Sequence, residues 1–189
     1  MDIIEFFEHS AGKWFSQRTL HNLTSGKLQA GKSELKIEIL SASDPAVIKV
    51  CSEHSIAPTL ATLAGIRVTW NVVADPNQKN GSTVLVPIPN SDNPKVGKLL
   101  KSADSYPKNA LGKPTVGFVT TYIIGEDDVL TLIGESEDFY ATERLWYLMP
   151  NLRIRTSVVK ESSGMTVASF CSEIRMGVSK PATETAVET

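Results

Sequence analysis

Two arginines separated by one residue, Arg153 and Arg155, are the side chains in this sequence with the clearest potential for chemistry. Aromatic and β-branched residues flank Pro150-Asn151 just before them, a pattern typical of two strands joined by a tight turn. Alternate side chains in a strand share a face, so Arg153, Arg155 and Ser157 point the same way. Guanidinium groups about 7 Å apart suit a ligand that carries two carboxylates. The alternative is a solvated outer face of a sheet, because arginine is seldom fully buried.

Segments along most of the chain carry a resemblance to a known family. They are Ser10–Thr19, Gly81–Pro87, Glu143–Trp146, Pro150–Ser157 and Ala168–Gly177, and the likeness covers roughly residues 1–177. In these segments the sequence resembles the S-type phycobiliprotein lyases, the CpcS/CpeS family. The resemblance implies a chromophore lyase that binds a linear tetrapyrrole, a bilin, as a transient substrate. It would attach phycocyanobilin or phycoerythrobilin through a thioether bond to a cysteine of an apo-phycobiliprotein subunit.

A bilin needs three kinds of side chain from such a protein. Its two propionates need cations, its rings need aromatic walls, and its exocyclic ethylidene becomes electrophilic when the tetrapyrrole is protonated. The predicted bilin-binding residues are Arg18, Trp70, Trp146, Arg153, Arg155 and Ser157. Plain core packing is the alternative for each tryptophan. The nucleophilic thiol would belong to the acceptor subunit, so the lyase would hold, orient and activate the pigment.

Glu143 is the predicted catalytic residue, acting as the proton donor. An apolar pocket disfavours the charged form of a carboxyl group, which would allow Glu143 to protonate the pigment. The alternative is a surface ion pair with an arginine of the neighbouring strand. Glu143 shares a strand face with Leu145 and Tyr147, so Trp146 points the other way unless a bulge shifts the register.

Composition narrows the function classes. The chain has 189 residues, of which 41% are hydrophobic, as expected of one folded domain. Its 19 basic and 21 acidic residues give no overall charge that would attract nucleic acid or anionic lipid. No apolar run approaches the roughly 20 residues of a membrane span, and the first residues are acidic, unlike a signal peptide. We therefore expect a cytoplasmic protein.

Neither cysteines nor histidines form a metal motif. Cys51 and Cys171 lie far apart without CxxC spacing, which indicates neither a zinc site nor a disulfide framework. The three histidines show no HxxH or HExxH pattern. We therefore predict no metal and no tightly bound cofactor.

Periodicity predicts a mainly β protein. A short amphipathic helix is expected over residues 2–10, capped by Asp2 with Glu5, and a longer one from Asp44-Pro45 to about His54. The expected strands are about 14–23, 32–41, 65–73, 82–88, 97–101, 115–124, 129–134, 137–149, 152–160 and 165–176. So many consecutive antiparallel strands favour a barrel or a sandwich, and closure removes exposed edges.

With the family resemblance, the predicted fold is a lipocalin-like, fatty-acid-binding-protein-like antiparallel β-barrel of about ten strands. Residues 1–177 would form one bilin-binding domain, and the polar residues 178–189 a disordered tail. Two other functions are consistent with such a barrel: a non-catalytic carrier of a bilin or another small carboxylate, and a barrel that works through protein contacts alone. A homodimer or a complex with a related lyase subunit is also possible.

Overall fold

The computed structural model describes residues 1–57, 65–73, 79–102 and 119–177. In these ranges the chain forms two helices and ten strands. They are α1 (Ile3–Ser10), β1 (Gly12–Asn22), β2 (Lys27–Leu40), α2 (Pro45–Glu53), β3 (Gly65–Val72), β4 (Gly81–Asn90), β5 (Asn93–Lys101), β6 (Val119–Ile124), β7 (Leu130–Ser136), β8 (Phe139–Met149), β9 (Leu152–Glu161) and β10 (Thr166–Arg175). Residues 115–118 of the sixth predicted strand and the predicted tail 178–189 lie outside the described residues.

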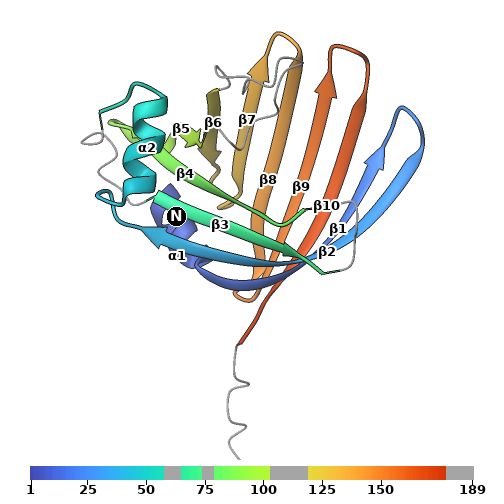
Figure 1. The fold of residues 1–189 in the computed structure, drawn as a ribbon, viewed down its shortest axis with the longest axis horizontal. Helices are drawn as coiled ribbons and strands as arrows, with labels where there is room; N and C mark the ends of the chain where they lie inside the picture. The colour runs from blue at the N-terminus through green and yellow to red at the C-terminus, as the bar shows by residue number, and fades with distance from the viewer. Residues whose placement is uncertain (58–64, 74–78, 103–118, 178–189) are drawn as a thin grey trace, which may run out of the picture.

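The strands form a closed antiparallel barrel, as predicted. Each strand pairs with its neighbour in sequence, and β1 also pairs with β10, which closes the barrel. Strands β7, β8, β9, β10 and β1 therefore stand side by side in one wall (Figure 1). Because alternate residues face inward, this wall brings together side chains from both ends of the sequence.

Helix α1 contributes to the barrel interior. Asp2 forms the predicted capping box, in which its carboxylate accepts from the backbone N–H groups of Ile4 and Glu5. The apolar stripe of α1 consists of Ile3, Phe6 and Phe7, which pack in one buried cluster with inward-facing residues of the strands. This helix thus fills part of the interior with hydrocarbon, and the rest remains for a cavity.

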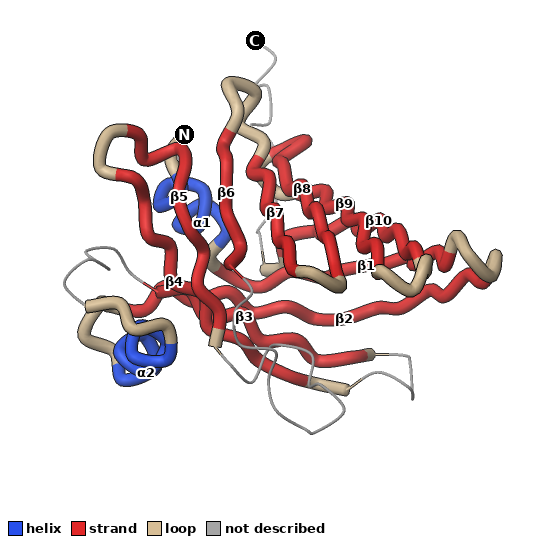
Figure 2. Tube along the Cα trace, turned by 90° about the horizontal axis from the view of Figure 1, so that it is seen from above, coloured by secondary structure: helices blue, strands red, loops and turns tan. Residues whose placement is uncertain are grey.

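Helix α2 covers the outside of the barrel. It begins after Asp44, whose side chain accepts from the N–H of Ala46, and it packs Val47 and Val50 against outward-facing Val84 on β4. Figure 2 shows α2 outside the ring of strands, beside β4. Strand β4 is therefore covered on both faces, which explains its unbroken apolar run where a half-exposed strand would alternate.

The β1–β2 hairpin is tighter than the sequence suggested. Gly26, at a φ of +71°, occupies the turn, whereas Gly31 lies within β2 opposite Arg18. Strand β2 consequently starts at Lys27 and not at residue 32. The predicted start at residue 32 was wrong because Gly31 lies inside the strand, and a strand accepts a glycine where a bulky side chain faces it.

Candidate functional site

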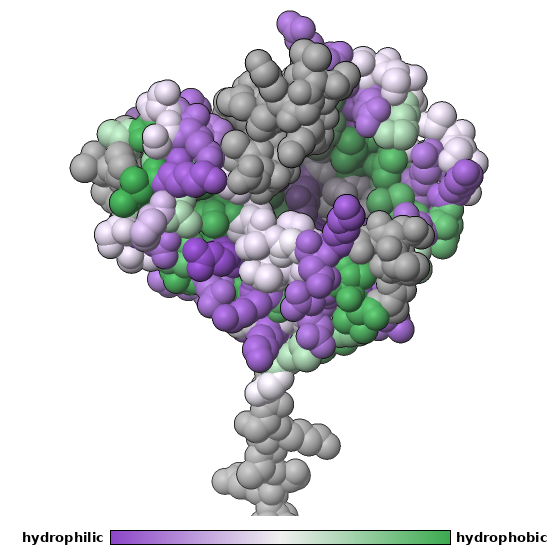
Figure 3. Space-filling model, in the orientation of Figure 1, coloured by the Kyte–Doolittle hydropathy of each residue, from purple (hydrophilic) through white to green (hydrophobic). Residues whose placement is uncertain are grey.

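A cavity of about 310 Å³ lies in the barrel interior. The described residues that line it divide into apolar side chains, which include Phe7, Leu35, Ile37, Val68, Trp70, Leu85, Leu130, Leu132 and Leu145, and polar ones, which include Ser16, Arg18, Ser33, Thr83, Lys101, Glu143, Arg153 and Arg155. The space-filling view shows a hollow in one face of the molecule, with hydrophilic and hydrophobic side chains around it (Figure 3). Four cations thus share the cavity lining with a single carboxylate among the described residues.

Strand register explains how distant residues meet at the polar side of the cavity. Ser16, Glu173, Arg153 and Tyr147 form one row across β1, β10, β9 and β8. The next row contains Arg18, Cys171, Arg155 and Leu145. Glu143 belongs to a third row and pairs with Ser157. The β1–β10 pairing therefore places the N-terminal Arg18 beside residues more than a hundred positions away.

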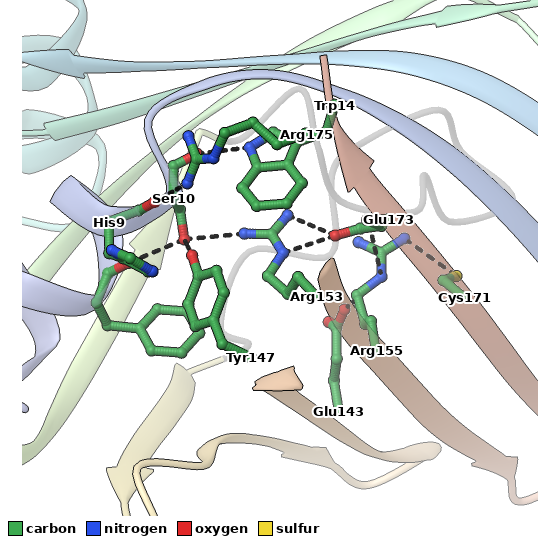
Figure 4. A network of polar contacts seen from close by, with 11 residues as sticks. His9, Ser10, Trp14, Glu143, Tyr147, Arg153, Arg155, Cys171, Glu173 and Arg175 are labelled. Carbon is green, nitrogen blue, oxygen red and sulfur yellow. Dashed lines mark hydrogen bonds and ion pairs between the residues drawn. The ribbon is translucent and has the colours of Figure 1, made fainter. Parts of the chain in front are cut away.

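Arg153 is held in a buried network. Its Nε donates to Glu173 Oε2 at 2.6 Å, and its terminal nitrogen Nη2 lies 2.6 Å from the same oxygen. The other terminal nitrogen, Nη1, donates to Ser10 Oγ at 2.9 Å (Figure 4). Arg153 is 3% exposed and Glu173 fully buried. The guanidinium has most of its donors occupied, so the structure does not support Arg153 as a free propionate ligand. Its face alternation was predicted correctly, but its partner was not.

Helix α1 is tied to this network through Ser10. Its hydroxyl donates to the carbonyl of Phe6 at 2.9 Å and lies 2.6 Å from the hydroxyl of Tyr147. Trp14 donates from Nε1 to the carbonyl of Ser10 at 2.8 Å, and the Arg153 guanidinium lies 5.1 Å from its ring centroid. Polar contacts and a cation–π contact thus fix the inner end of the cavity against α1.

Arg175 stacks on the same tryptophan. Its guanidinium carbon lies 4.2 Å from the centroid of the Trp14 ring, and one of its terminal nitrogens donates to the carbonyl of Ala11 at 2.6 Å. A second nitrogen donates to the carbonyl of His9 (Figure 4). A cation therefore satisfies carbonyls at the C-terminal end of α1, where the helix dipole favours positive charge.

Arg155 is less tightly held and remains accessible from the cavity. Its Nε lies 3.3 Å from Glu143 Oε1 and 3.8 Å from Glu173 Oε1, and a terminal nitrogen contacts Cys171 Sγ at 3.7 Å. The side chain keeps 31% of its surface exposed. Burial opposes its charged form, but Glu143 and then Glu173 outweigh this effect and raise the pKa of Arg155. This arginine is the better placed of the two for a ligand carboxylate.

Glu143 combines the two alternatives raised by the sequence. It lines the cavity, as the acid hypothesis requires, and it also forms an ion pair with Arg155 of the neighbouring strand. Its side chain is 29% exposed. A cation, and not only hydrocarbon, therefore lies beside this carboxyl group.

The remaining predicted residues fall into two groups. Arg18 and Trp70 line the cavity, and Trp70 donates from Nε1 to the carbonyl of Lys79 at 3.0 Å. The Trp70 ring lies against Gly81, where a Cβ would come within 2.4 Å of it. Ser157 contacts Ser169 at 2.7 Å beside Glu143 but does not line the cavity.

Trp146 requires a correction. It lies on β8 between Leu145 and Tyr147, which belong to the interior core, and is paired with outward-facing Ile154 of β9. The register shift in this hairpin comes only after Tyr147, too late to turn Trp146 inward. The prediction that Trp146 walls the cavity is therefore wrong, and strict alternation along β8 was the correct interpretation.

Sequence reasoning missed two charged residues. Glu173 lies two residues after Cys171 and shares the inner face of β10 with it. Lys101 lies two residues after buried Leu99 and shares the inner face of β5 with it. Period-two patterning could have placed both on inner faces, but it could not indicate which cations Glu173 would meet. In the described part of the chain, no group of three or more histidine, cysteine, aspartate or glutamate side chains could hold a metal ion, and no helix is suited to crossing a membrane.

Comparison with known protein families identifies the family of this chain. The model of the CpeS-like protein family matches residues 2–176. The chain belongs to the CpeS-like family. This match spans all ten strands and both helices, including every residue of the polar cavity wall.

Relatives of this CpeS-like chain have informative names. A protein of Trichodesmium erythraeum named chromophore lyase CpcS/CpeS 1 is 48% identical over 177 residues, which cover 93% of this chain and 98% of the relative. A Picosynechococcus protein named phycocyanobilin lyase subunit CpcS is 36% identical, with 100% and 93% covered. The solved S-type phycobiliprotein lyase CPES from Guillardia theta superposes with a TM-score of 0.78 at 31% identity, covering 95% of each chain.

Proposed function

We propose that this protein is a bilin lyase that binds free phycocyanobilin or phycoerythrobilin in its barrel and attaches it to a cysteine of an apo-phycobiliprotein subunit. The observation that carries the proposal is the cavity, in which cations and a carboxylate on one wall face an apolar surface that includes Trp70. The names of the relatives support the same reaction class. The pigment would be a transient substrate.

Each part of the pigment has a matching region of the cavity. Arg18, Lys101 and the accessible part of Arg155 supply positive charge for the two propionates. Trp70 and the leucines on the facing strands supply an apolar surface for the rings. A volume of about 310 Å³ falls at the lower end of the range for small-molecule sites, which suits a single ligand.

Glu143 is the proposed proton donor. Transfer of its proton to a pyrrole nitrogen would leave a carboxylate and a cationic tetrapyrrole, which makes the ethylidene carbon electrophilic. The thiolate of the acceptor cysteine then forms a carbon–sulfur bond at that carbon, and the ethylidene double bond shifts into the ring system. The net reaction adds one S–H across one double bond, so no oxidant or reductant is required.

The partners follow from the chemistry. An apo-phycobiliprotein subunit must approach the cavity with its cysteine, and both proteins would meet in the cytoplasm. One relative carries the word subunit in its name, which supports assembly with a second copy or with a related lyase chain.

One assay separates this function from the carrier alternative. Purified protein is incubated with phycocyanobilin and apo-subunit, and the products are denatured before separation. A lyase leaves a coloured, denaturation-resistant adduct on the acceptor, whereas a carrier gives only a shift in the absorption of the bound pigment. Absence of a covalent adduct with every bilin and acceptor pair tested would contradict the proposed activity.

A further inference from the structure

The two carboxylate oxygens of Glu173 have unequal surroundings. Oε2 takes both contacts from Arg153 at 2.6 Å. Oε1 is buried and has no hydrogen-bond partner among the residues that the structure describes, although Arg155 Nε lies 3.8 Å away (Figure 4). An unsatisfied buried oxygen on a charged group is costly, so this one requires an explanation.

Arg155 lies between this oxygen and Glu143. Its Nε is 3.3 Å from Glu143 Oε1 and 3.8 Å from Glu173 Oε1, whereas short charge-assisted hydrogen bonds measure about 2.7–2.9 Å. Neither carboxylate therefore holds Arg155 in a short bond. The guanidinium can move toward either one by less than the length of a bond.

We propose that Glu173 is a positioning residue that takes over Arg155 when a ligand carboxylate enters the cavity, which leaves Glu143 free to carry a proton. The inference rests on the proposed function and adds a role for a residue that touches no substrate. A propionate beside Arg155 brings a second negative charge close to Glu143, and two carboxylates sharing one site favour protonation of one of them. Arg153 already occupies Oε2 of Glu173, so the buried Oε1 is the oxygen that can receive Arg155.

The surrounding charges are consistent with this exchange. The charged and titratable groups that face the Arg155 region are Arg18 from β1, Lys101 from β5, Glu143 and Tyr147 from β8, Arg153 from β9, and Cys171 and Glu173 from β10. Of the carboxylates that the structure describes, only Glu143 both lines the cavity and has Arg155 as its cationic partner.

The test is the pH profile of pigment transfer in Glu173→Gln. In this variant Arg155 has only Glu143 as a carboxylate partner, so the pair persists and Glu143 stays charged to lower pH. We expect the affinity for phycocyanobilin to stay within about threefold of the parent. The pH at which the transfer rate is half-maximal should fall by at least about one unit. Bound phycocyanobilin should also lose absorption of the protonated form near neutral pH. Glu135→Gln, at an exposed carboxylate on β7, is the matched control and should leave the profile unchanged.

Two results would overturn the proposal. One is a parental pH profile in Glu173→Gln, and the other is an equal loss of binding and transfer without a shift in the profile, which would indicate a structural role. If Glu173→Gln does not fold, Arg153→Gln combined with Glu173→Gln removes both buried charges, leaves the net charge unchanged, and should show the same acid shift. A parent that binds pigment but makes no adduct would contradict the proposed function instead, so the two failures are distinguishable.

Discussion

Replacing Arg153 and Arg155 separately by alanine should have very different effects on stability. Arg153 is almost fully buried against Glu173, so Arg153→Ala leaves a carboxylate in the interior without its ion-pair partner. Arg155 is 31% exposed and makes two longer ion-pair contacts, at 3.3 and 3.8 Å. Although the two arginines are separated by one residue on one strand face, we expect only the first substitution to threaten the fold.

The expected magnitudes follow from burial. Removal of one partner of a buried ion pair costs about 3–5 kcal/mol, whereas a solvent-screened pair contributes about 0–1 kcal/mol. A total stability of about 5–15 kcal/mol would survive the second change easily and the first only in part. At about 2–4 °C per kcal/mol for a chain of this size, Arg153→Ala should lower the melting temperature by about 10 °C and Arg155→Ala by less than about 4 °C.

Urea unfolding followed by tryptophan fluorescence measures this difference, because the Trp14 ring lies under the Arg153 guanidinium. Arg144→Ala, at an exposed position of β8, controls for the loss of an arginine as such. Phycocyanobilin titration, at a temperature where all variants are folded, should give the opposite ranking. Arg155→Ala should lower the binding affinity more than Arg153→Ala does, although it costs less stability. Equal stability losses for the two variants would refute the assignment of Arg153 to the structural network.

Further outcomes are expected for the tryptophans, for Glu143 and for the two cysteines. Trp70→Ala should reduce the spectral change on phycocyanobilin binding more than it lowers the melting temperature, whereas Trp14→Ala should cost about 3–5 kcal/mol because that ring is fully buried. Glu143→Gln should bind phycocyanobilin but transfer it about 10²–10⁴ times more slowly in single-turnover assays; transfer at the parental rate would move the acid elsewhere. Burial raises the pKa of both Cys51 and Cys171, so neither thiol should react with iodoacetamide at pH 8 until the protein unfolds. For the same reason stability should fall as pH rises above the unfolded value of about 9, where only the unfolded chain loses thiol protons.

Local patterns were sufficient to predict both helices and most of the strands, whereas the choice of a barrel over a sandwich relied on the family resemblance. Turn residues such as Pro150-Asn151 separated the strands, and alternation placed Arg153 and Arg155 on one face, which in the structure is the inner face of β9. The helix caps at Asp2 and Asp44 were also readable, because capping depends on residues a few positions apart. These features are decided within short windows of sequence, so no knowledge of the barrel was needed.

The sequence did not predict in the same way which residues would pair with the two interior arginines. Arg153 meets Glu173 only because β9 lies beside β10, and it meets Ser10 only because α1 packs into the same interior. Sequence alone therefore left Arg153 and Arg155 equivalent, although one is committed to a buried carboxylate and the other is not. Trp146 failed for a different reason: its inward placement required a bulge before it in β8, and the register shift comes only after Tyr147.

Closure of the barrel between β1 and β10 has a consequence for how the protein is made. The contacts between Trp14 and Arg175 join residues at opposite ends of the chain, so the wall that carries them is assembled only after the last strand has been synthesised. Long-range pairing of this kind slows folding, because the chain must close a very long loop before it gains the contact. During synthesis one edge of β1 therefore stays unpaired until β10 has been made. A nascent chain that stops before residue 166 would lack Cys171, Glu173 and the whole closing strand. The polar wall of the cavity should therefore form only after residues 166–175 have been synthesised.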